Sequence, residues 1–425
     1  MSYSFRLVDE PSFDVQTVKQ YISQNYDEVV GYYKNNSLRS AFQPIFSIAH
    51  KRIVGYEALV RGQNSKGRRI SPLEIFAADK SERAIVFLDR LCRYLHLGNF
   101  QFLGDDINWL YLNLTPTSVC NRRKYGVYFE ELLEEYSFPP SRVVVEIVEH
   151  PIQDEELLLD AANYYKSLGC LIAIDDFGAG YSNFERVWKL APHVVKLDRS
   201  MIEQASEEKK IRELFPGIVS LLHQAGSLVL IEGVETEEQA IIAMDSDVDF
   251  VQGYYFAKPM ECFTEIKDYH FPFDKLFDSY KSVSAAKERL GQGNITYHKK
   301  IISRVIDELR RGKSFEEASI PLMGEQSVIR CYLLLPEGLQ IGSTLLSNRG
   351  MDNADPRFRP LEDAKSADWF RRHYLRRATV HPDQIQVTRP YLSITGGHMC
   401  TTMSVMFRSP EGDRVFCCDL INEDE

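Results

Sequence analysis

The 425-residue sequence lacks several features that would place it in a familiar class at once. No apolar run approaches the roughly 20 residues that span a bilayer, and no signal peptide is recognisable, so we expect no membrane span. The eight cysteines form no CxxC pair, which favours reduced thiols in a cytoplasm over a disulfide framework. There is no internal repeat and no low-complexity tract, so neither a repeat architecture nor a disordered chain is expected.

Positive charge is also in short supply. The sequence has 50 Lys and Arg against 61 Asp and Glu, a formal net charge of −11. Such a chain is a poor candidate for binding a nucleic-acid polymer or an anionic membrane. A small anionic substrate remains possible if cations mediate its binding.

Changes of pattern divide the chain into four segments, in keeping with one large domain and a smaller one. Residues 1–39 have helix-like spacing and predict a leading helical segment. Residues 40–262 predict a barrel, on the pattern described below. Residues 263–313 predict a charged helical linker, interrupted at residues 291–294. In residues 314–425 the pattern changes again, to strand hairpins and a helix, and predicts a smaller α+β domain.

Eight short β-rich runs recur between residues 40 and 262, mostly separated by segments of helical periodicity. They are "AFQPIFSI", "RIVGYEALV", "WLYLNLT", "RVVVEIVE", "CLIAIDD", "HVVKLD", "SLVLIEG" and "FVQGYYF". The helical pattern is clear after Asp154, where Leu157, Ala161 and Leu168 share one face and Gly169 ends the helix. Eight alternating units predict a (β/α)8 TIM-like barrel.

One connection departs from this rule. Only "AHKR" or so separates the first two runs, whereas a parallel crossover needs a dozen or more residues. The first two strands are therefore expected to form an antiparallel hairpin, which makes the barrel a modified one.

Polar residues stand at or near the ends of these runs. They are Glu57, Asn113, Glu146, Asp175, Asp176, Lys196, Glu232 and Gln252. The carboxyl ends of barrel strands converge on one mouth, where such folds do their chemistry. Carboxylates gathered there would repel one another unless they bound cations, and ligands that are all oxygen suit Mg²⁺ or Mn²⁺.

The adjacent pair Asp175 and Asp176 needs an explanation of its own. Successive strand residues point to opposite faces, so both can face one cavity only if the strand ends and the backbone turns. Gly178 and Gly180 would permit that turn. Asp175 would then bridge two cations, a standard arrangement for in-line attack on a phosphodiester. Taken alone, the pair would instead indicate a helix cap or a turn.

Several motifs occur in one order over half the chain: "QPIF", "YEALVR", "LNLTP", "EIVEH", "DDFGAGYS", "VKLD", "EGVET" and "QGYYFAKP". In these motifs the chain resembles the EAL domain, a family that hydrolyses the bacterial second messenger cyclic di-GMP to the linear dinucleotide 5'-pGpG. The resemblance implies a metal-dependent cyclic di-GMP phosphodiesterase with two divalent cations, Mg²⁺ or Mn²⁺, and a homodimer.

The resemblance also implies roles for individual residues. One cation would be held by Glu57, Asn113, Glu146 and Asp175, and the other by Asp175, Asp176 and Glu232. Lys196 and Gln252 would position or deprotonate the attacking water, although Lys196 alone also fits a snorkelling barrel lysine or an ion pair with Asp198. Substrate contacts would come from Gln43, Arg61 and Asp198. Glu149 would anchor the loop after Asp176, and Glu235 would support Glu232.

The C-terminal domain is loosely similar to PAS-like or Cache-like sensor domains, which implies an unknown small ligand and regulation of the barrel. Two hairpins are predicted, around 336–338 and 410–412, with a helix over "KSADWFRRHYLRRA". The basic residues of that helix fit a solvated face with Trp369 and Tyr374 packed on the sheet, or a ligand pocket. His398, Cys400, Cys417 and Cys418 match no common zinc spacing and are expected to be structural.

Two rival functions remain. The chain could be a receptor that binds cyclic di-GMP without cleaving it, although degenerate domains of that kind usually lack some acidic ligands that this sequence keeps. A pure interaction scaffold would not require the charged set at all.

Overall fold

The computed structural model describes residues 13–120, 128–148, 155–180, 184–261, 263–348, 350, 367–393 and 399–421. The chain divides into two compact units, residues 1–284 and residues 285–425, and each unit has a hydrophobic core. Within the described ranges no helix combines the length and the apolar character needed to cross a membrane.

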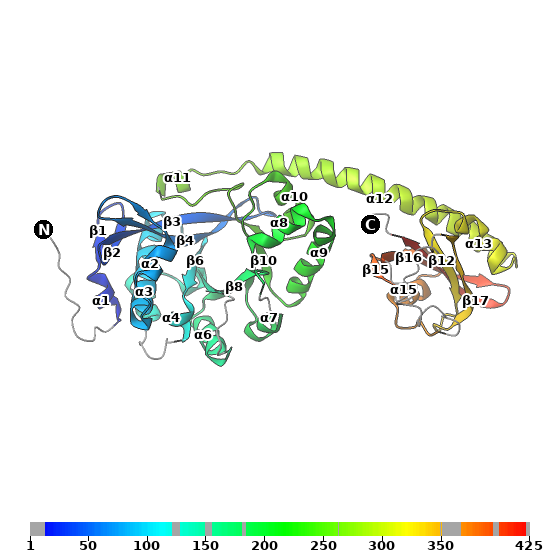
Figure 1. Ribbon diagram of the computed structural model, residues 1–425, viewed down its shortest axis with the longest axis horizontal. Helices are drawn as coiled ribbons and strands as arrows, with labels where there is room; N and C mark the ends of the chain where they lie inside the picture. The colour runs from blue at the N-terminus through cyan, green and yellow to red at the C-terminus, as the bar shows by residue number, and fades with distance from the viewer. Residues whose placement is uncertain are drawn as a thin grey trace. The chain divides into compact units, whose positions relative to one another are not determined.

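Eight strands of the first unit close into a barrel (Figure 1). Going round it, the order is β3, β11, β10, β9, β8, β7, β6 and β4, and β4 pairs with β3 again. The strands are β3 (Asn36–Ser47), β4 (Arg52–Asn64), β6 (Trp109–Leu114), β7 (Val143–Val148), β8 (Leu171–Phe177), β9 (Val194–Leu197), β10 (Leu228–Ile231) and β11 (Phe250–Val251). β3 runs antiparallel to both neighbours, and the other pairs are parallel. The predicted barrel with an antiparallel first strand is confirmed.

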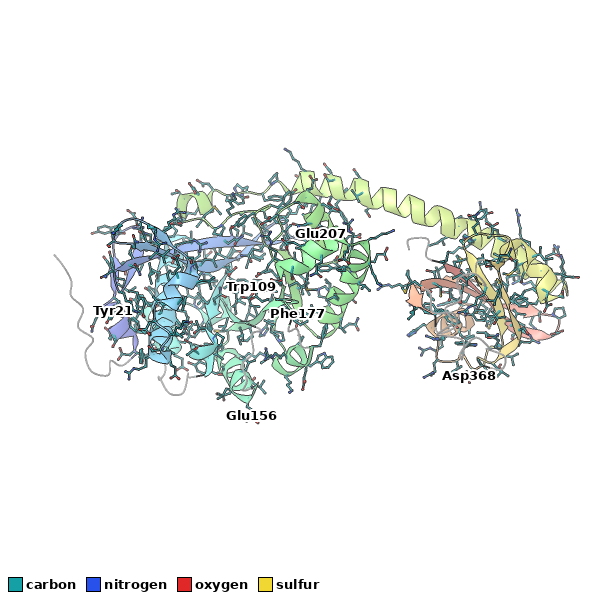
Figure 2. The ribbon with its side chains drawn as sticks, viewed as in Figure 1. Tyr21, Trp109, Glu156, Phe177, Glu207 and Asp368 are labelled. Atoms are coloured by element: carbon teal, nitrogen blue, oxygen red, sulfur yellow. The ribbon has the colours of Figure 1, made fainter. Side chains whose placement is uncertain are left out.

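Helices surround these strands, as the alternating pattern predicts (Figure 1). They are α2 (Pro72–Ala77), α3 (Glu82–Phe102), α4 (Pro116–Cys120), α5 (Phe129–Glu135), α6 (Glu155–Ser167), α7 (Phe184–Leu190), α8 (Arg199–Glu207), α9 (Lys209–Gln224), α10 (Glu237–Asp245) and α11 (Phe263–Lys267), with a 3-10 turn at Pro140–Arg142 and a short strand β5 (Arg69–Ile70). α6 ends as expected: Gly169 has a φ of 95°, and the Cys170 amide donates to the carbonyl of Tyr165. Side chains fill the space between strands and helices (Figure 2).

The prediction of a helical segment over residues 1–39 is wrong for most of the part that the structure describes. Only α1 (Val15–Lys19) is helical there, and β1 (Ile22–Gln24) and β2 (Val29–Tyr33) follow it. β2 pairs with β3 and thereby extends the sheet beyond the barrel. Its β-branched and aromatic residues favour a strand once β3 offers a pairing edge, and helical spacing does not report that contact.

The linker is also different from the prediction. α12 (Phe273–Arg310) is one helix of 38 residues and is not interrupted at residues 291–294. Its first residues pack on the core of the first unit through Phe273 and Leu276, whereas Ile302 and Val305 belong to the core of the second unit. Each end of the predicted linker is therefore part of a compact unit.

The second unit is a six-stranded antiparallel sheet with helices on it, which agrees with the predicted α+β class. Its elements are α13 (Phe315–Met323), β12 (Val328–Leu334), β13 (Gln340–Leu346), α15 (His373–Val380), β14 (Gln386–Val387), β15 (Tyr391–Leu392), β16 (Met399–Ser409) and β17 (Gly412–Ile421). The strand order is β13, β12, β17, β16 and β14, and β15 also pairs with β16. Both predicted hairpins, β12–β13 and β16–β17, are present.

The predicted helix over "KSADWFRRHYLRRA" begins later than expected, at His373. Asp368 instead bridges to Leu339, and the Trp369 amide donates to the carbonyl of Gly338, so this stretch pairs with the β12–β13 turn. Tyr374 is buried and Trp369 packs beside it, which supports the packed interpretation of these two aromatics. Cys400, Cys417 and Cys418 are buried thiols without disulfides, and His398 lies outside the described residues.

Candidate active site

The barrel interior is built in two layers. The lower layer is apolar and consists of Ile45, Tyr111, Val144, Ala173, Val194, Leu230 and Phe250. Two positions away on the same strands stand Gln43, Asn113, Glu146, Asp175, Lys196, Glu232 and Gln252. Because residues two apart point to the same face of a strand, these polar side chains form the next layer, toward the carboxyl ends of the parallel strands.

Lys196 is the centre of the polar layer. Its Nζ atom lies 2.5 Å from Glu146 Oε1, 2.5 Å from Glu232 Oε1 and 2.8 Å from Asp175 Oδ1. A fourth carboxylate, that of Glu57, is 3.9 Å away. Lys196 is only 1% exposed, and these distances make it the counter-ion of the whole set. The predicted alternative, an ion pair with Asp198, does not occur.

Glu57 is held by two side-chain amides, one on the neighbouring strand β6 and one directly after β11. Asn113 donates through Nδ2 to Glu57 Oε1 at 3.0 Å, and Gln252 donates through Nε2 to Glu57 Oε2 at 2.9 Å. The buried Oε1 atom of Gln252 has no hydrogen-bond partner in the described part of the chain. Strand β4 thus presents a carboxylate of fixed orientation beside a free amide oxygen.

Asp175 and Asp176 reach the same place because strand β8 is irregular. The register between β8 and β9 shifts between Ile174 and Phe177, and Asp176 has a φ of 56° in the left-handed region. The sequence predicted that the strand ends at the two aspartates, but β8 continues to Phe177. A bulge within the strand, and not its end, brings the second carboxylate inward. Carboxylate oxygens of Asp175, Asp176 and Glu232 then lie within 4.8 Å of one another, a spacing that fits a metal ion.

Gly178 closes this turn, as predicted. Its φ is 105°, and a Cβ atom there would lie 2.1 Å from the sulfur of Met201. A side chain at this position would require Met201 to move, so the glycine lets the backbone pass close to helix α8. Gly180 also has a positive φ, of 113°, but has open space around it.

The carboxylates of the polar layer are only partly compensated by the positive charge of Lys196, and the pKa values of three of them reflect this. Burial raises the pKa of Glu146 well above its ordinary value and that of Glu232 to about 8, although Lys196 opposes both shifts. Burial and then Asp175 raise the pKa of Asp176 to about 6. For Lys196, burial lowers the pKa, but Asp175, Glu146 and Glu232 outweigh it and raise it well above the usual range. The ammonium therefore keeps its proton, and the carboxylates take up protons or bind cations.

The residues present fit divalent cations. Five carboxylates (Glu57, Glu146, Asp175, Asp176 and Glu232) face one ammonium, which leaves four negative charges when all are ionised. Two divalent cations would balance that charge. Four carboxylate oxygens are buried: both oxygens of Glu146, Oδ1 of Asp175 and Oε1 of Glu232. Apart from the ion pairs that Lys196 makes with three of them, they have no hydrogen-bond partner within the described ranges. Such oxygens are suitable ligands for Mg²⁺ or Mn²⁺.

The remaining predicted residues differ in how closely they join this layer. Gln43 lies opposite Glu57 in the β3–β4 register and donates through Nε2 to the carbonyl of Ala257 at 3.1 Å. Arg61 shares the Glu57 face of β4; burial lowers its pKa, and no ion pair holds it in the described part of the chain. Its only described hydrogen bond is donated to the carbonyl of Val60.

Two residues have a structural task. Asp198 caps helix α8 by accepting a hydrogen bond from the Ser200 amide at 3.0 Å. Glu235 is exposed and accepts a 2.6 Å hydrogen bond from Arg199, and no contact with Glu232 is described. Their predicted substrate and support roles stay predictions. Glu149 lies outside the described residues.

The sequence interpretation missed Tyr111. Its side chain is fully buried directly below the polar layer, and its hydroxyl has no hydrogen-bond partner within the described ranges. Burial raises its pKa, Glu146 raises it further and Lys196 lowers it, so the phenol lies in the field of both groups. The signal was available, because Tyr111 stands two positions before Asn113 and must share its face.

Fold and site together define a (β/α)8-type barrel with a carboxylate-rich mouth suited to divalent cations. The chain belongs to the EAL family: the EAL domain model matches residues 27–259, more than half of the sequence.

Relatives of known name support this assignment. The cyclic di-GMP phosphodiesterase RocR of Pseudomonas aeruginosa is 33% identical over 159 residues, which cover 37% of this chain and 40% of RocR. The EAL-domain containing protein YkuI of Bacillus subtilis is 26% identical over 345 residues, which cover 77% of this chain and 80% of YkuI. The chain thus matches less than half the length of RocR but most of YkuI.

A solved structure shares the fold over most of the chain. The crystal structure of B. subtilis YkuI, in complex with substrate c-di-GMP and calcium, covers 91% of this chain and 96% of its own, with a TM-score of 0.76 and 23% identity. That coverage extends beyond the barrel, so the fold of the second unit is also shared. At this level of identity the likeness establishes the fold alone.

Proposed function

We propose that this chain is a cyclic di-GMP phosphodiesterase that hydrolyses its substrate to linear 5'-pGpG with the help of divalent cations. The observation that carries the proposal is the convergence of Glu57, Asn113, Glu146, Asp175 and Glu232 around Lys196 in one barrel layer. Membership of the EAL family and the name of RocR support the choice of substrate.

Two cations, Mg²⁺ or Mn²⁺, would be held as the resemblance to the EAL family implies, one by Glu57, Asn113, Glu146 and Asp175 and the other by Asp175, Asp176 and Glu232. Bound there, they would polarise the phosphodiester and make a bound water a stronger nucleophile. Their charge would also balance the four excess negative charges of the mouth. Without the cations, those charges would repel a dianionic substrate.

Lys196 and Gln252 would position the attacking water. In the cation-free protein the carboxylates raise the pKa of Lys196 and keep it a charged hydrogen-bond donor. The Oε1 atom of Gln252 is a buried acceptor without a partner, and its Nε2 is fixed on Glu57, so it would accept a hydrogen bond from that water. Arg61, with no ion pair in the described part of the chain, would contact a phosphate of the substrate.

We further propose that the second unit senses a small ligand and tunes the barrel, that the chain forms a homodimer and that it works in the cytoplasm. The second unit has a separate core, which fits an independent sensor domain, and the six described cysteines are thiols, which fits a reducing compartment.

The test is to incubate the purified protein with cyclic di-GMP and Mg²⁺ or Mn²⁺, with an EDTA control, and to follow the nucleotides by chromatography. We expect metal-dependent appearance of 5'-pGpG and its loss in Asp175→Asn. Asp247→Asn is the matched control, because Asp247 is exposed and has a φ of 62° that Asn also adopts. Tight binding of intact cyclic di-GMP without turnover would instead favour the receptor, and a fully active Asp175→Asn protein would exclude the two-cation arrangement.

A further inference from the structure

Tyr111 is an unusual residue for the inside of this barrel. It is fully buried in a layer whose other members are all apolar. A buried hydroxyl without a partner is destabilising, and a phenylalanine of the same shape would avoid that penalty. Its hydroxyl is the one polar atom of that layer's side chains, and it has no hydrogen-bond partner in the described part of the chain.

Gly55 makes room for the Tyr111 ring. A Cβ atom at Gly55 would lie 2.8 Å from Cε2 of Tyr111, closer than atoms normally approach. Gly55 also stands two positions before Glu57, on the same face of β4, where every other parallel strand of the barrel carries a side chain in the lower layer. Two neighbouring strands are thus matched so that this phenol fits beneath the carboxylates.

Glu146 is the candidate acceptor for this hydroxyl, two positions beyond the Val144 that faces Tyr111 in the β6–β7 register. Neither oxygen of Glu146 accepts a hydrogen bond of ordinary geometry within the described ranges, and its close partner is Lys196, which it shares with Asp175 and Glu232. Strands β6 and β7 are paired, and both Glu146 and Lys196 act electrostatically on the phenol. Lys196 contacts Oε1 of Glu146, so Oε2 has no partner within the described ranges.

We propose that Tyr111 is a positioning residue of the cation site: its hydroxyl donates a hydrogen bond to Glu146, directly or through one buried water, when cations occupy the mouth. Carboxylates that bind metals are oriented by such donors, and losing one typically weakens metal binding 10- to 100-fold. The inference rests on the cation site of the proposed function but not on the identity of the substrate.

The experiment measures Mn²⁺ binding by titration calorimetry, without substrate, in the full-length protein and in Tyr111→Phe. We expect about 10- to 100-fold weaker binding in the variant, with a melting temperature in EDTA that is unchanged or higher because an unpaired hydroxyl has been removed. Tyr56→Phe is the matched control: Tyr56 is also buried, but it lies on the other face of β4, against Phe100. Its Mn²⁺ affinity should stay within about 2-fold of the unmodified protein's.

Gly55→Ala is a second, independent variant that keeps the hydroxyl and displaces the ring. It should weaken Mn²⁺ binding as well, so the inference remains testable if Tyr111→Phe does not fold. Unchanged Mn²⁺ affinity in either folded variant would overturn the role of Tyr111 and leave the proposed function intact. If the unmodified protein binds no Mn²⁺ or Mg²⁺, both the cation site and the role of Tyr111 are overturned.

Discussion

Lys196 and Glu146 form a fully buried ion pair in the barrel mouth, with 2.5 Å between Nζ and Oε1. A buried ion pair alone is weak evidence of stability, because desolvation offsets the attraction. Here, however, one ammonium serves three carboxylates, so removing it leaves several buried negative charges without a counter-ion. Lys196 therefore allows the mouth to fold before cations arrive.

We predict that Lys196→Met lowers the stability of the cation-free protein. Breaking a buried pair costs about 3–5 kcal/mol, and the value should fall at the low end because the carboxylates can take up protons. Thermal unfolding in EDTA measures the loss, and added Mg²⁺ should recover more stability in the variant than in the unmodified protein. Lys281→Met is the control, since its contact with Asp278 is exposed and 3.9 Å long. Equal melting temperatures of Lys196→Met and the unmodified protein in EDTA would contradict this role.

The strands and most of the site could be predicted from the sequence because short stretches of sequence determine both. From β6 onward each barrel strand is a short apolar run whose polar site residue stands at or near its carboxyl end, as Glu146 and Lys196 illustrate. The topology then brings residues that are far apart in the chain into one layer. Neither step needs knowledge of tertiary contacts.

Most of the errors depend on contacts that the spacing of residues along the chain does not report. β2 is a strand because it pairs with β3, and helical spacing alone cannot report that partner. The stretch around Trp369 leaves the predicted helix because it bonds to the carbonyl of Gly338. Asp176 enters the site through a bulge set by the pairing of β8 with β9. Tyr111 was overlooked because an aromatic in a strand normally indicates only packing.

Gly178 and Gly180 allow the effect of backbone strain on stability to be distinguished from the effect of a close contact. Both have positive φ values, so an alanine at either should cost about 1–2 kcal/mol from backbone strain. Only Gly178 is also in close contact, where a Cβ would meet the sulfur of Met201 at 2.1 Å. We therefore predict that Gly178→Ala lowers the free energy of unfolding further than Gly180→Ala and lowers kcat/KM by displacing Asp176. Denaturant unfolding and steady-state kinetics check both parts. Equal effects of the two variants would mean that contact with Met201 does not matter.

Arg61 should act on substrate binding and not on the chemical step. Its guanidinium is half-buried on the same face of β4 as Glu57 and has no ion pair in the described residues. A hydrogen bond to a charged group contributes about 1.5–3 kcal/mol, so Arg61→Ala should raise KM about 10- to 150-fold at nearly constant kcat. Arg69→Ala is the control, since Arg69 is exposed and pairs with Glu261 at 3.6 Å. A fall in kcat with unchanged KM would place Arg61 in the chemical step instead.

The second unit contains a buried ion pair with a different consequence. Arg330 donates through Nε to Asp419 Oδ2 at 2.6 Å, and Thr402 donates to Asp419 Oδ1 at 2.6 Å, all in the sheet interior. Asp419→Leu should therefore lower the stability of this sheet by about 3 kcal/mol, because it leaves a buried guanidinium without its carboxylate. Adding Arg330→Met should recover most of the loss, since no charge then remains. Hydrogen exchange at β12, β16 and β17 measures both effects.

Arg408→Ala is the control for this prediction: it breaks an exposed pair with Asp413 and should change the stability of the sheet little. If the double variant is no more stable than Asp419→Leu, the loss comes from packing or from the Thr402 hydrogen bond and not from the uncompensated charge.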